Sequence, residues 1–141
     1  MKGHKFLDHT ADIKVEAWGE TLEEAFEAAG TAFYDVMLDV EKVDKRIEKR
    51  IKVTGFDIMS LLFNWIDQLI LIFELDNLVF RDFKVDIRIN GEDYRLEALG
   101  FGEEYKKEKH GYKVHVKAMT YHEMEIIEEG DRVVIRYVVD I

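Results

Sequence analysis

The 141-residue sequence contains no cysteine and no proline. Without cysteine, the chain has no disulfide framework, no thiolate zinc or iron–sulfur site and no cysteine nucleophile. Its only serine, Ser60, lies in a strongly apolar segment and belongs to no nucleophile pattern. The glycine-rich phosphate loops of nucleotide-binding proteins and the HExxH zinc motif are also absent. These absences argue against a conventional hydrolase.

Basic residues are in the minority. The 20 lysines and arginines stand against 30 aspartates and glutamates, which gives a formal net charge of −10. Such a charge repels phosphate backbones, because nucleic-acid affinity comes largely from lysine and arginine side chains that displace condensed counterions. Strong direct binding of DNA or RNA is therefore disfavoured, although a local basic patch is compatible with the composition.

Long apolar runs are absent as well. The longest uninterrupted run, Leu69–Phe73, is far shorter than the ~18 residues that a membrane helix needs. The start of the chain, Met1–Phe6, lacks the apolar region of a signal peptide. We therefore expect a soluble, cytoplasmic protein that binds no membrane. Because no linker, repeat or low-complexity tract interrupts it, residues 1–141 are expected to form a single domain with its own core.

Two segments show helical periodicity. Thr21 and Glu24 match the capping box that begins a helix, and apolar residues then recur at helical spacing to about Leu38. In Asp57–Asn77 the polar residues fall on one narrow stripe, and the remaining residues are apolar. A helix of that kind is buried on several sides, so we expect this segment to lie across a sheet.

Alternation of polar and apolar residues predicts several strands. An edge strand is predicted for Val43–Val53, because lysines interrupt its apolar face, and a hairpin turn is predicted at Asn90–Gly91. Further strands are expected over residues 13–18, 83–89, 94–98, 112–118, 120–127 and 132–141, with a charged loop at 103–111. This order indicates the α+β class, with antiparallel or mixed β-sheets packed against two main helices in one compact domain.

The densest polar cluster outside a helix is Asp8-His9-Thr10-Ala11-Asp12. Carboxylates with a hydroxyl and an imidazole suit a hard divalent cation, which prefers oxygen ligands and accepts an occasional imidazole. The same residues also suit a turn in which Asp8 and Asp12 accept hydrogen bonds from nearby backbone amides. Spacing alone leaves both interpretations open.

The end of the sequence carries a second unusual feature. Asp140 falls on the strand face of Val134, Arg136 and Val138, beside the terminal carboxylate of Ile141. A cation would relieve this concentration of negative charge. The simpler alternative is a solvated chain end.

A third group, Lys117, His122 and Glu123, surrounds a predicted junction between two strands. A lysine, a histidine and a glutamate there could position a phosphate or a carboxylate. They could equally form the exposed face of a twisted hairpin. On the strand that precedes the junction, we expect Lys117 to share a face with Lys113 and the Tyr112 side chain to point into the core.

Taken together, three motifs resemble the archease family: Asp8-His9-Thr10-Ala11-Asp12, Lys117-Ala118-Met119-Thr120-Tyr121-His122 and Val139-Asp140-Ile141. The resemblance covers essentially the whole chain, and the three motifs in this order are jointly specific although each is short. It implies a small α+β protein that is not itself an enzyme. Archeases are cofactors of the RNA-splicing ligase that joins a 3′-phosphate or 2′,3′-cyclic phosphate end to a 5′-hydroxyl end during tRNA maturation.

The resemblance also implies how such a protein acts. It would promote guanylylation of the active-site histidine of the ligase and allow multiple turnover. A divalent metal ion, calcium or another hard cation, would be held by Asp12 and Asp140, with Ile141 beside them. The remaining motif residues are then candidates for contacting or activating the ligase: Asp8, His9, Lys117, His122 and Glu123.

Two other functions are compatible with the same residues. One is a metal-dependent enzyme that acts on a small phosphorylated or nucleotide substrate, and the other is a chaperone-like module for RNA-processing enzymes. The enzyme needs a closed pocket around Asp12 with a general base within reach of the substrate. The ligase cofactor needs the same residues at an exposed rim.

Overall fold

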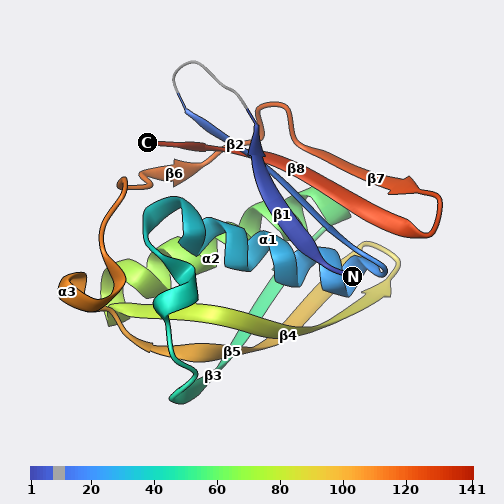
Figure 1. Ribbon diagram of the computed structural model, residues 1–141. Coiled ribbons are helices and arrows are strands. Elements are labelled where there is room, and N and C mark those ends of the chain that lie inside the picture. Colours follow the sequence, from blue (N-terminus) through green and yellow to red (C-terminus); the bar gives the residue numbers. More distant parts are fainter. Residues whose placement is uncertain (8–11) are drawn as a thin grey trace.

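The computed structural model describes residues 1–7 and 12–141. Two antiparallel sheets enclose a layer of helices (Figure 1). The elements in chain order are β1 Gly3–Leu7, β2 Ile13–Gly19, α1 Leu22–Met37, a short 3₁₀ turn η1 Val40–Lys42, β3 Ile47–Gly55, α2 Ile58–Asp76, β4 Leu78–Asn90, β5 Asp93–Glu104, α3 Lys107–His110, β6 Ala118–Met119, β7 Glu125–Glu129 and β8 Arg132–Asp140. The predicted α+β class with two main helices is confirmed.

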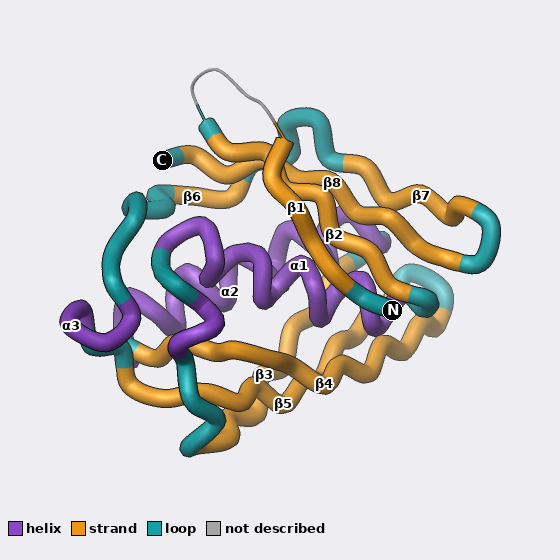
Figure 2. The backbone as a smooth tube through the Cα atoms, in the orientation of Figure 1, coloured by secondary structure: helices purple, strands orange, loops and turns teal. Residues whose placement is uncertain are grey.

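The strands form one larger and one smaller sheet. The larger sheet has five strands in the order β1-β2-β8-β6, with β7 also paired to β8, and the smaller sheet has the order β3-β5-β4. Figure 2 shows the two long helices between the sheets. The last strand, β8, pairs with β2 on one side and with β6 and β7 on the other. Strand β2 and the last strand are therefore neighbours, as the expected metal site requires.

Helix α1 begins where the capping pattern predicts. The Thr21 hydroxyl accepts a hydrogen bond from the N–H of Glu24 at 3.1 Å. In return, Glu24 Oε1 accepts from the N–H of Glu20 and not from that of Thr21, the donor expected in a capping box. The helix packs on β2 of the larger sheet and on β4 of the smaller one. The indole of Trp65 and the hydroxyl of Tyr137 donate to carbonyls of this helix at 3.0 and 2.8 Å. Helix α1 thus joins the two sheets through one shared core.

Helix α2 begins with a capping box formed by Asp57 and the only serine, Ser60. Asp57 Oδ1 accepts the N–H of Ser60 at 2.7 Å, and Ser60 Oγ accepts the N–H of Asp57 at 3.2 Å. At the other end Asn77 has a left-handed φ of 56°. By length and composition α2 is the one helix in residues 1–7 and 12–141 that could cross a membrane, but a core helix meets the same criterion. Its innermost side chains are fully buried, as predicted for a core helix: Leu61, Leu62, Trp65, Ile66 and Leu69.

Two boundaries differ from the predictions. The edge strand β3 begins at Ile47 and not at Val43, because residues 43–46, which follow η1, form an irregular segment and Val43 is buried in the core. Its position at an edge of the sheet is confirmed. The hairpin turn between β4 and β5 consists of Gly91 and Glu92, since Asn90 is still paired within the ladder. Gly91 alone takes a positive φ there, 65°.

The predicted strand 112–118 is wrong. Only Ala118–Met119, strand β6, pairs with another strand. The segment before it finds a backbone partner elsewhere, because the N–H of Lys113 donates to the carbonyl of Met37 at the end of α1, at 2.7 Å. Tyr112, predicted to point into the core, is 53% exposed.

The remaining differences concern short segments. The predicted strand 120–127 begins only at Glu125, and the predicted charged loop 103–111 contains the end of β5 and the whole of α3. Strand β1 is not predicted by periodicity, because two apolar residues, Phe6 and Leu7, follow each other in its five-residue span. These elements are set by their neighbours in the fold more than by their own sequence.

Candidate metal and partner-binding site

The pairing of β2 with β8 brings the two candidate metal-binding aspartates to the same end of the larger sheet. The ladder ends with Ile13 opposite Val139, and continuing this register by one residue places Asp12 opposite Asp140. Residues directly opposite each other in an antiparallel pair have Cα atoms about 4.5–5.5 Å apart. Asp12 is partly buried and Asp140 is exposed. The two carboxylates therefore share one neighbourhood although they are far apart in the sequence.

Lys117 reaches this end of the sheet through its main chain. Its N–H donates to the carbonyl oxygen of Asp140 at 2.8 Å, next to the ladder pair that Ala118 forms with Asp140. The Lys117 side chain is exposed and makes no ion pair within residues 1–7 and 12–141. Its ammonium group is therefore available to a ligand or a partner.

Glu123 and His122 approach the same end from a loop. Lys14 Nζ lies 3.3 Å from Glu123 Oε1, and His122 Nε2 lies 3.2 Å from Glu123 Oε2. Lys14 is two residues from Asp12 and is opposite Val138 in the ladder. Glu123 has a left-handed φ of 53°, a conformation that residues other than glycine rarely adopt. The Lys14 contact thus holds this loop against the end of β2.

Most of the predicted site residues therefore lie around one end of the larger sheet. The exposed Ile141 follows Asp140 at this end, and Figure 1 shows the chain end beside β6. Asp8 and His9, which the sequence motif also includes, lie outside the described residues. The functional role of the whole group remains a prediction.

The donor atoms at this end suit a hard cation in kind. Asp12 and Asp140 supply carboxylate oxygens, and main-chain oxygens of Ile141 lie next in the chain, which are the ligands that calcium prefers. In the part of the chain that the structure describes, no three His, Cys, Asp or Glu side chains form a metal-binding group. A cation held here would take two carboxylates and complete its shell with main-chain oxygens or water.

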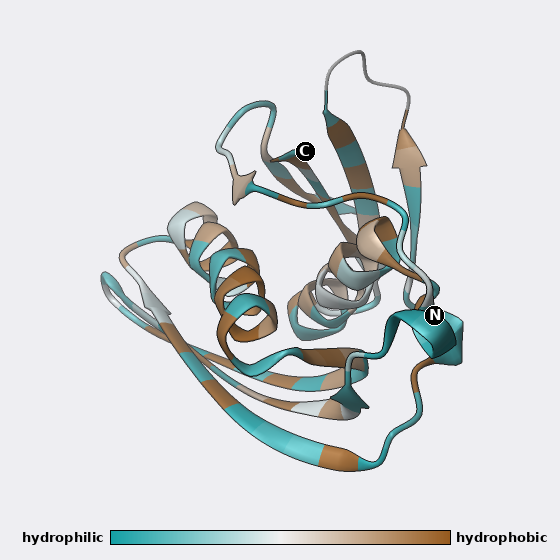
Figure 3. Ribbon diagram, turned by 90° about the vertical axis from the view of Figure 1, so that its left-hand side faces the viewer, coloured by the Kyte–Doolittle hydropathy of each residue, from teal (hydrophilic) through white to brown (hydrophobic). Residues whose placement is uncertain are grey.

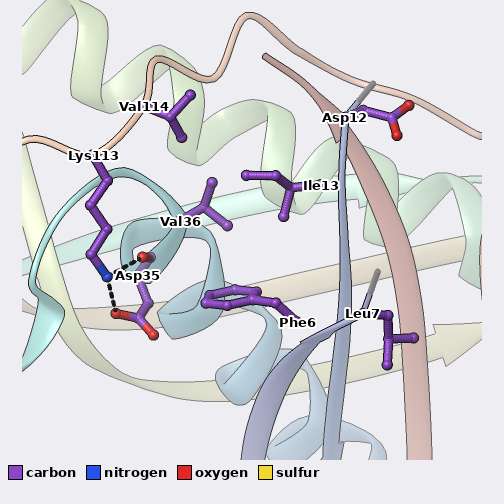
Figure 4. A pocket seen from close by; sticks show the side chains of 8 residues that line it. All are labelled: Phe6, Leu7, Asp12, Ile13, Asp35, Val36, Lys113 and Val114. Carbon is purple, nitrogen blue, oxygen red and sulfur yellow. Dashed lines mark hydrogen bonds and ion pairs between the residues drawn. The ribbon is translucent and has the colours of Figure 1, made fainter. Parts of the chain in front are cut away.

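A hollow of about 430 Å³ lies beside this end, between β1, the end of α1 and the segment around Val114. Figure 4 shows Asp12 on one side of the hollow, with its carboxylate directed away from the pair formed by Asp35 and Lys113 on the other side. Phe6, which lines the hollow, is 43% exposed. Asp12 therefore borders the hollow, but its side chain is partly buried and its Oδ1 is shielded from solvent.

Asp35 is a charged residue of this hollow that sequence reasoning missed. His4 Nε2 lies 3.0 Å from Asp35 Oδ2, and Lys113 Nζ lies 3.4 Å from Oδ1. The hydrogen bond with His4, supported by the charge of Lys113, holds the pKa of Asp35 below its ordinary value of 3.8 although partial burial acts to raise it. A signal was present, because a carboxylate in the last turn of a helix opposes the helix dipole and needs cationic partners.

A second charged cluster surrounds Glu103 at the end of β5. This carboxylate accepts the N–H of Asp44 at 2.8 Å and contacts Lys109 Nζ at 2.8 Å. The fully buried His110 accepts the N–H of Lys106 at Nδ1, so its Nε2 carries the proton donated to Glu103 at 2.9 Å. Burial raises the pKa of Glu103, but these hydrogen bonds outweigh burial and lower it to about 2. Because its polar groups are paired with each other, the cluster fastens α3 to the sheet.

Comparison with known proteins places these residues in a family. The model of the archease protein family (MTH1598/TM1083) matches residues 4–141. The archease of Pyrococcus abyssi is 44% identical over 126 residues, which cover 89% of each chain. The archease of Sulfolobus acidocaldarius is 43% identical over 141 residues, which cover 100% of each chain.

Solved structures agree with this assignment. The solution structure of protein 1598 from Methanobacterium thermoautotrophicum matches with a TM-score of 0.84, at 38% identity and with 99% of both chains covered. A crystal structure from Thermotoga maritima, described as an archease and possible chaperone, has a TM-score of 0.59 at 20% identity and covers 97% of this chain and 96% of that one. That second likeness shows the fold alone. By its family match, its relatives and its fold, the chain belongs to the archease family.

Proposed function

We propose that this protein is a non-enzymatic cofactor of the RNA-splicing ligase that joins a 3′-phosphate or 2′,3′-cyclic phosphate end to a 5′-hydroxyl end in tRNA splicing. It promotes guanylylation of the active-site histidine of the ligase and allows multiple turnover. The observation that carries the proposal is the β2–β8 register, which brings Asp12 and Asp140 to an open end of the sheet in a member of the archease family.

Asp12 and Asp140 are the proposed ligands of a divalent cation, calcium or another hard ion, with Ile141 beside them. When bound, such a cation offsets phosphate charge during phosphoryl transfer. Asp12 contributes from the rim of the hollow and Asp140 from the exposed end of β8. The main-chain N–H of Lys117 is hydrogen-bonded to the carbonyl oxygen of Asp140. Its side-chain ammonium balances the charge of the two carboxylates or contacts an acidic group or a phosphate on the ligase.

The proposed partner is the ligase and not the RNA. A net charge of −10 favours association with the basic, phosphate-binding mouth of a ligase and opposes strong direct binding of RNA. Asp8, His9, His122 and Glu123 are the proposed contact residues around the cation. We place this activity in the cytoplasm, without a membrane partner.

The direct test is guanylylation of purified ligase with GTP and divalent metal, with and without this protein. We expect the ligase–guanylate adduct to form faster when the protein is present, and each ligase molecule to complete more than one ligation. Unchanged guanylylation and turnover in the presence of stoichiometric protein would refute the proposal.

A chaperone-like role for RNA-processing enzymes is the second candidate. It is favoured by the description of the Thermotoga maritima relative as a possible chaperone. A chaperone would reduce light scattering by heat-unfolded ligase and leave guanylylation of native ligase unchanged. The alternative of a metal-dependent enzyme gains no support from the open hollow at Asp12, because catalysis on a small substrate calls for a site that excludes water.

A further inference from the structure

The basic residues of this acidic protein are concentrated in one short segment. Residues 45–52 contain one acid, Glu48, and five of the 20 lysines and arginines of the chain: Lys45, Arg46, Lys49, Arg50 and Lys52. The segment leads into β3 and forms most of that strand. A quarter of the lysines and arginines therefore lies within eight consecutive residues of a chain with a net charge of −10, and three of them, Lys49, Arg50 and Lys52, belong to β3 itself.

Strand β3 is open on one side. All nine of its residues pair with β5, and no other strand within residues 1–7 and 12–141 pairs with it. Alternate N–H and C=O groups of an edge strand point away from its neighbour and remain available for a further strand. Figure 3 shows the three-stranded sheet below the two long helices, which cover its inner face only. The Thr54 carbonyl already accepts a hydrogen bond from Asn64 Nδ2 at 2.8 Å. The rest of the outer edge of β3 has no neighbouring strand to complete its hydrogen bonds.

The cations of β3 have weak partners. Lys49 Nζ lies 3.7 Å from Asp76, and Lys52 Nζ lies 3.8 Å from Glu97. Exposed pairs of this kind contribute about 0–1 kcal/mol. Arg50 makes no ion pair with any described residue. These side chains can therefore turn to the carboxylates of a partner at little cost in stability.

Positive charge without a partner continues on the outer face next to this edge. Arg50 is opposite Leu99 of β5, which in turn is opposite Lys84 of β4. A hollow of about 380 Å³ is lined by these three residues among others, and Lys84 also makes no ion pair in the described part of the chain.

We propose that β3 is a docking edge for an acidic, extended segment of a partner protein, which adds to the smaller sheet as a fourth strand. The main chain of the partner completes the open ladder, and its carboxylates lie beside Arg50 and Lys52. Like charges on opposed strands destabilise a pair, so the cations of β3 disfavour pairing between two copies and favour an acidic strand. The edge belongs to the other sheet from Asp12 and Asp140 and does not depend on the function proposed above.

A peptide strand fits this edge better than a nucleic acid does. An extended peptide both donates to and accepts from the alternate main-chain groups of β3 at the spacing of a strand, whereas a phosphate backbone offers acceptors alone. A strand added to the edge lies next to β3 alone. A nucleic acid lying across the outer face would also meet the opposed carboxylates of Asp86 and Glu97, which repel phosphates.

The test uses the full chain and a synthetic nine-residue peptide of alternating glutamate and valine with blocked ends. Amide hydrogen exchange, followed by NMR, should slow at alternate residues of Ile47–Gly55 when the peptide is added. Arg50→Glu and, independently, Lys52→Glu should each weaken peptide binding about tenfold. Arg88→Glu is the matched control, because Arg88 is an exposed arginine on β4, the opposite edge strand of the same sheet. It should leave the affinity unchanged.

Several results would overturn the proposal. They are unchanged exchange along β3, protection that maps to β4, or equal binding of a peptide with lysine in place of glutamate. If a single-stranded oligouridylate protects the same amides and displaces the peptide at a lower concentration, the edge is a nucleic-acid site. The fingerprint spectrum of each variant shows whether it is folded, so loss of binding is separated from loss of structure.

Discussion

The main-chain N–H of Lys117 donates a hydrogen bond of 2.8 Å to the carbonyl oxygen of Asp140. This bond holds Lys117 at the end of β8, although Lys117 itself belongs to no strand. The pairing of β2 with β8 brings the two candidate metal ligands, Asp12 and Asp140, to the same end. The side chain plays no part in the bond. Its removal therefore tests the ammonium group without disturbing the local backbone.

Lys117→Ala is expected to weaken ligase activation with little effect on folding, because an exposed lysine contributes about 0–1 kcal/mol through ion pairs. The measurement is multiple-turnover ligation at a saturating concentration of this protein. Lys107→Ala is the control, since Lys107 is also exposed and makes no ion pair with a described residue. Wild-type activity from both variants would remove Lys117 from the site, and equal losses would indicate a diffuse docking surface.

Asp12→Asn and Asp140→Asn are each expected to lower calcium affinity at least about tenfold, because each removes one charged oxygen ligand at constant size. Calorimetric titration of calcium into the purified protein measures this. The thermal midpoint should stay within about 2 °C of that of the unaltered protein. Asp131→Asn, in the exposed turn before β8, is the control. A sharp fall in the midpoint with unchanged calcium binding would identify Asp12 as a structural turn residue.

Stability at acid pH is predicted to depend on Glu103. Its pKa falls from an ordinary value of 4.5 to about 2 in the folded protein. Between these pH values the unfolded chain binds the additional proton, so the free energy of unfolding decreases as the pH falls from about 4.5 towards 2. The contribution is complete above that range, absent below it and of the order of 3 kcal/mol.

Urea denaturation at a series of pH values measures this dependence. Glu103→Gln should destabilise the protein at neutral pH and flatten the decline between pH 4.5 and 2, because the amide cannot be titrated. Glu104→Gln is the control, since Glu104 is the exposed neighbour. An undiminished decline in the Glu103 variant would assign the effect to other carboxylates.

Association with the ligase is expected to slow as salt concentration rises. The Debye length contracts from ~30 Å at 0.01 M to ~8 Å at 0.15 M salt, which weakens steering between an acidic protein and a basic mouth. Stopped-flow mixing at several salt concentrations measures the rate. Salt-independent association would point to an apolar interface, and tight binding of this protein to RNA alone would contradict the argument from its net charge of −10.

Local patterns predict the helices well. The bounds of α2 follow from Asp57 and Asn77, whose capping interactions lie within a few residues of the helix ends. The proximity of Asp12 and Asp140 does not follow from any local pattern, because it depends on the pairing of β2 with β8. Only the resemblance to a family connects these two residues before the structure is known.

The segment 112–118 shows where periodicity fails. Val114 and Val116 alternate with polar residues as in a strand, and Val116 is buried. The hydrogen-bond partner of Lys113 is nevertheless a helix end, which no alternation of residues reveals. Asp35 is missed for a related reason, since its partners His4 and Lys113 come from distant parts of the chain.

The position of β8 has a consequence for the order of folding. This strand comes last among the elements, yet it lies between β2 and the β6 and β7 strands. The smaller sheet and α2 are drawn from the continuous stretch 47–104 and can form while later residues are still being synthesised. Contacts between segments that are distant in the sequence form slowly. Strand β2 therefore has β1 as its only paired strand until β8 is present. A nascent or partly folded chain therefore cannot bring Asp12 and Asp140 together. A partner that binds both carboxylates at once consequently binds only the fully folded protein.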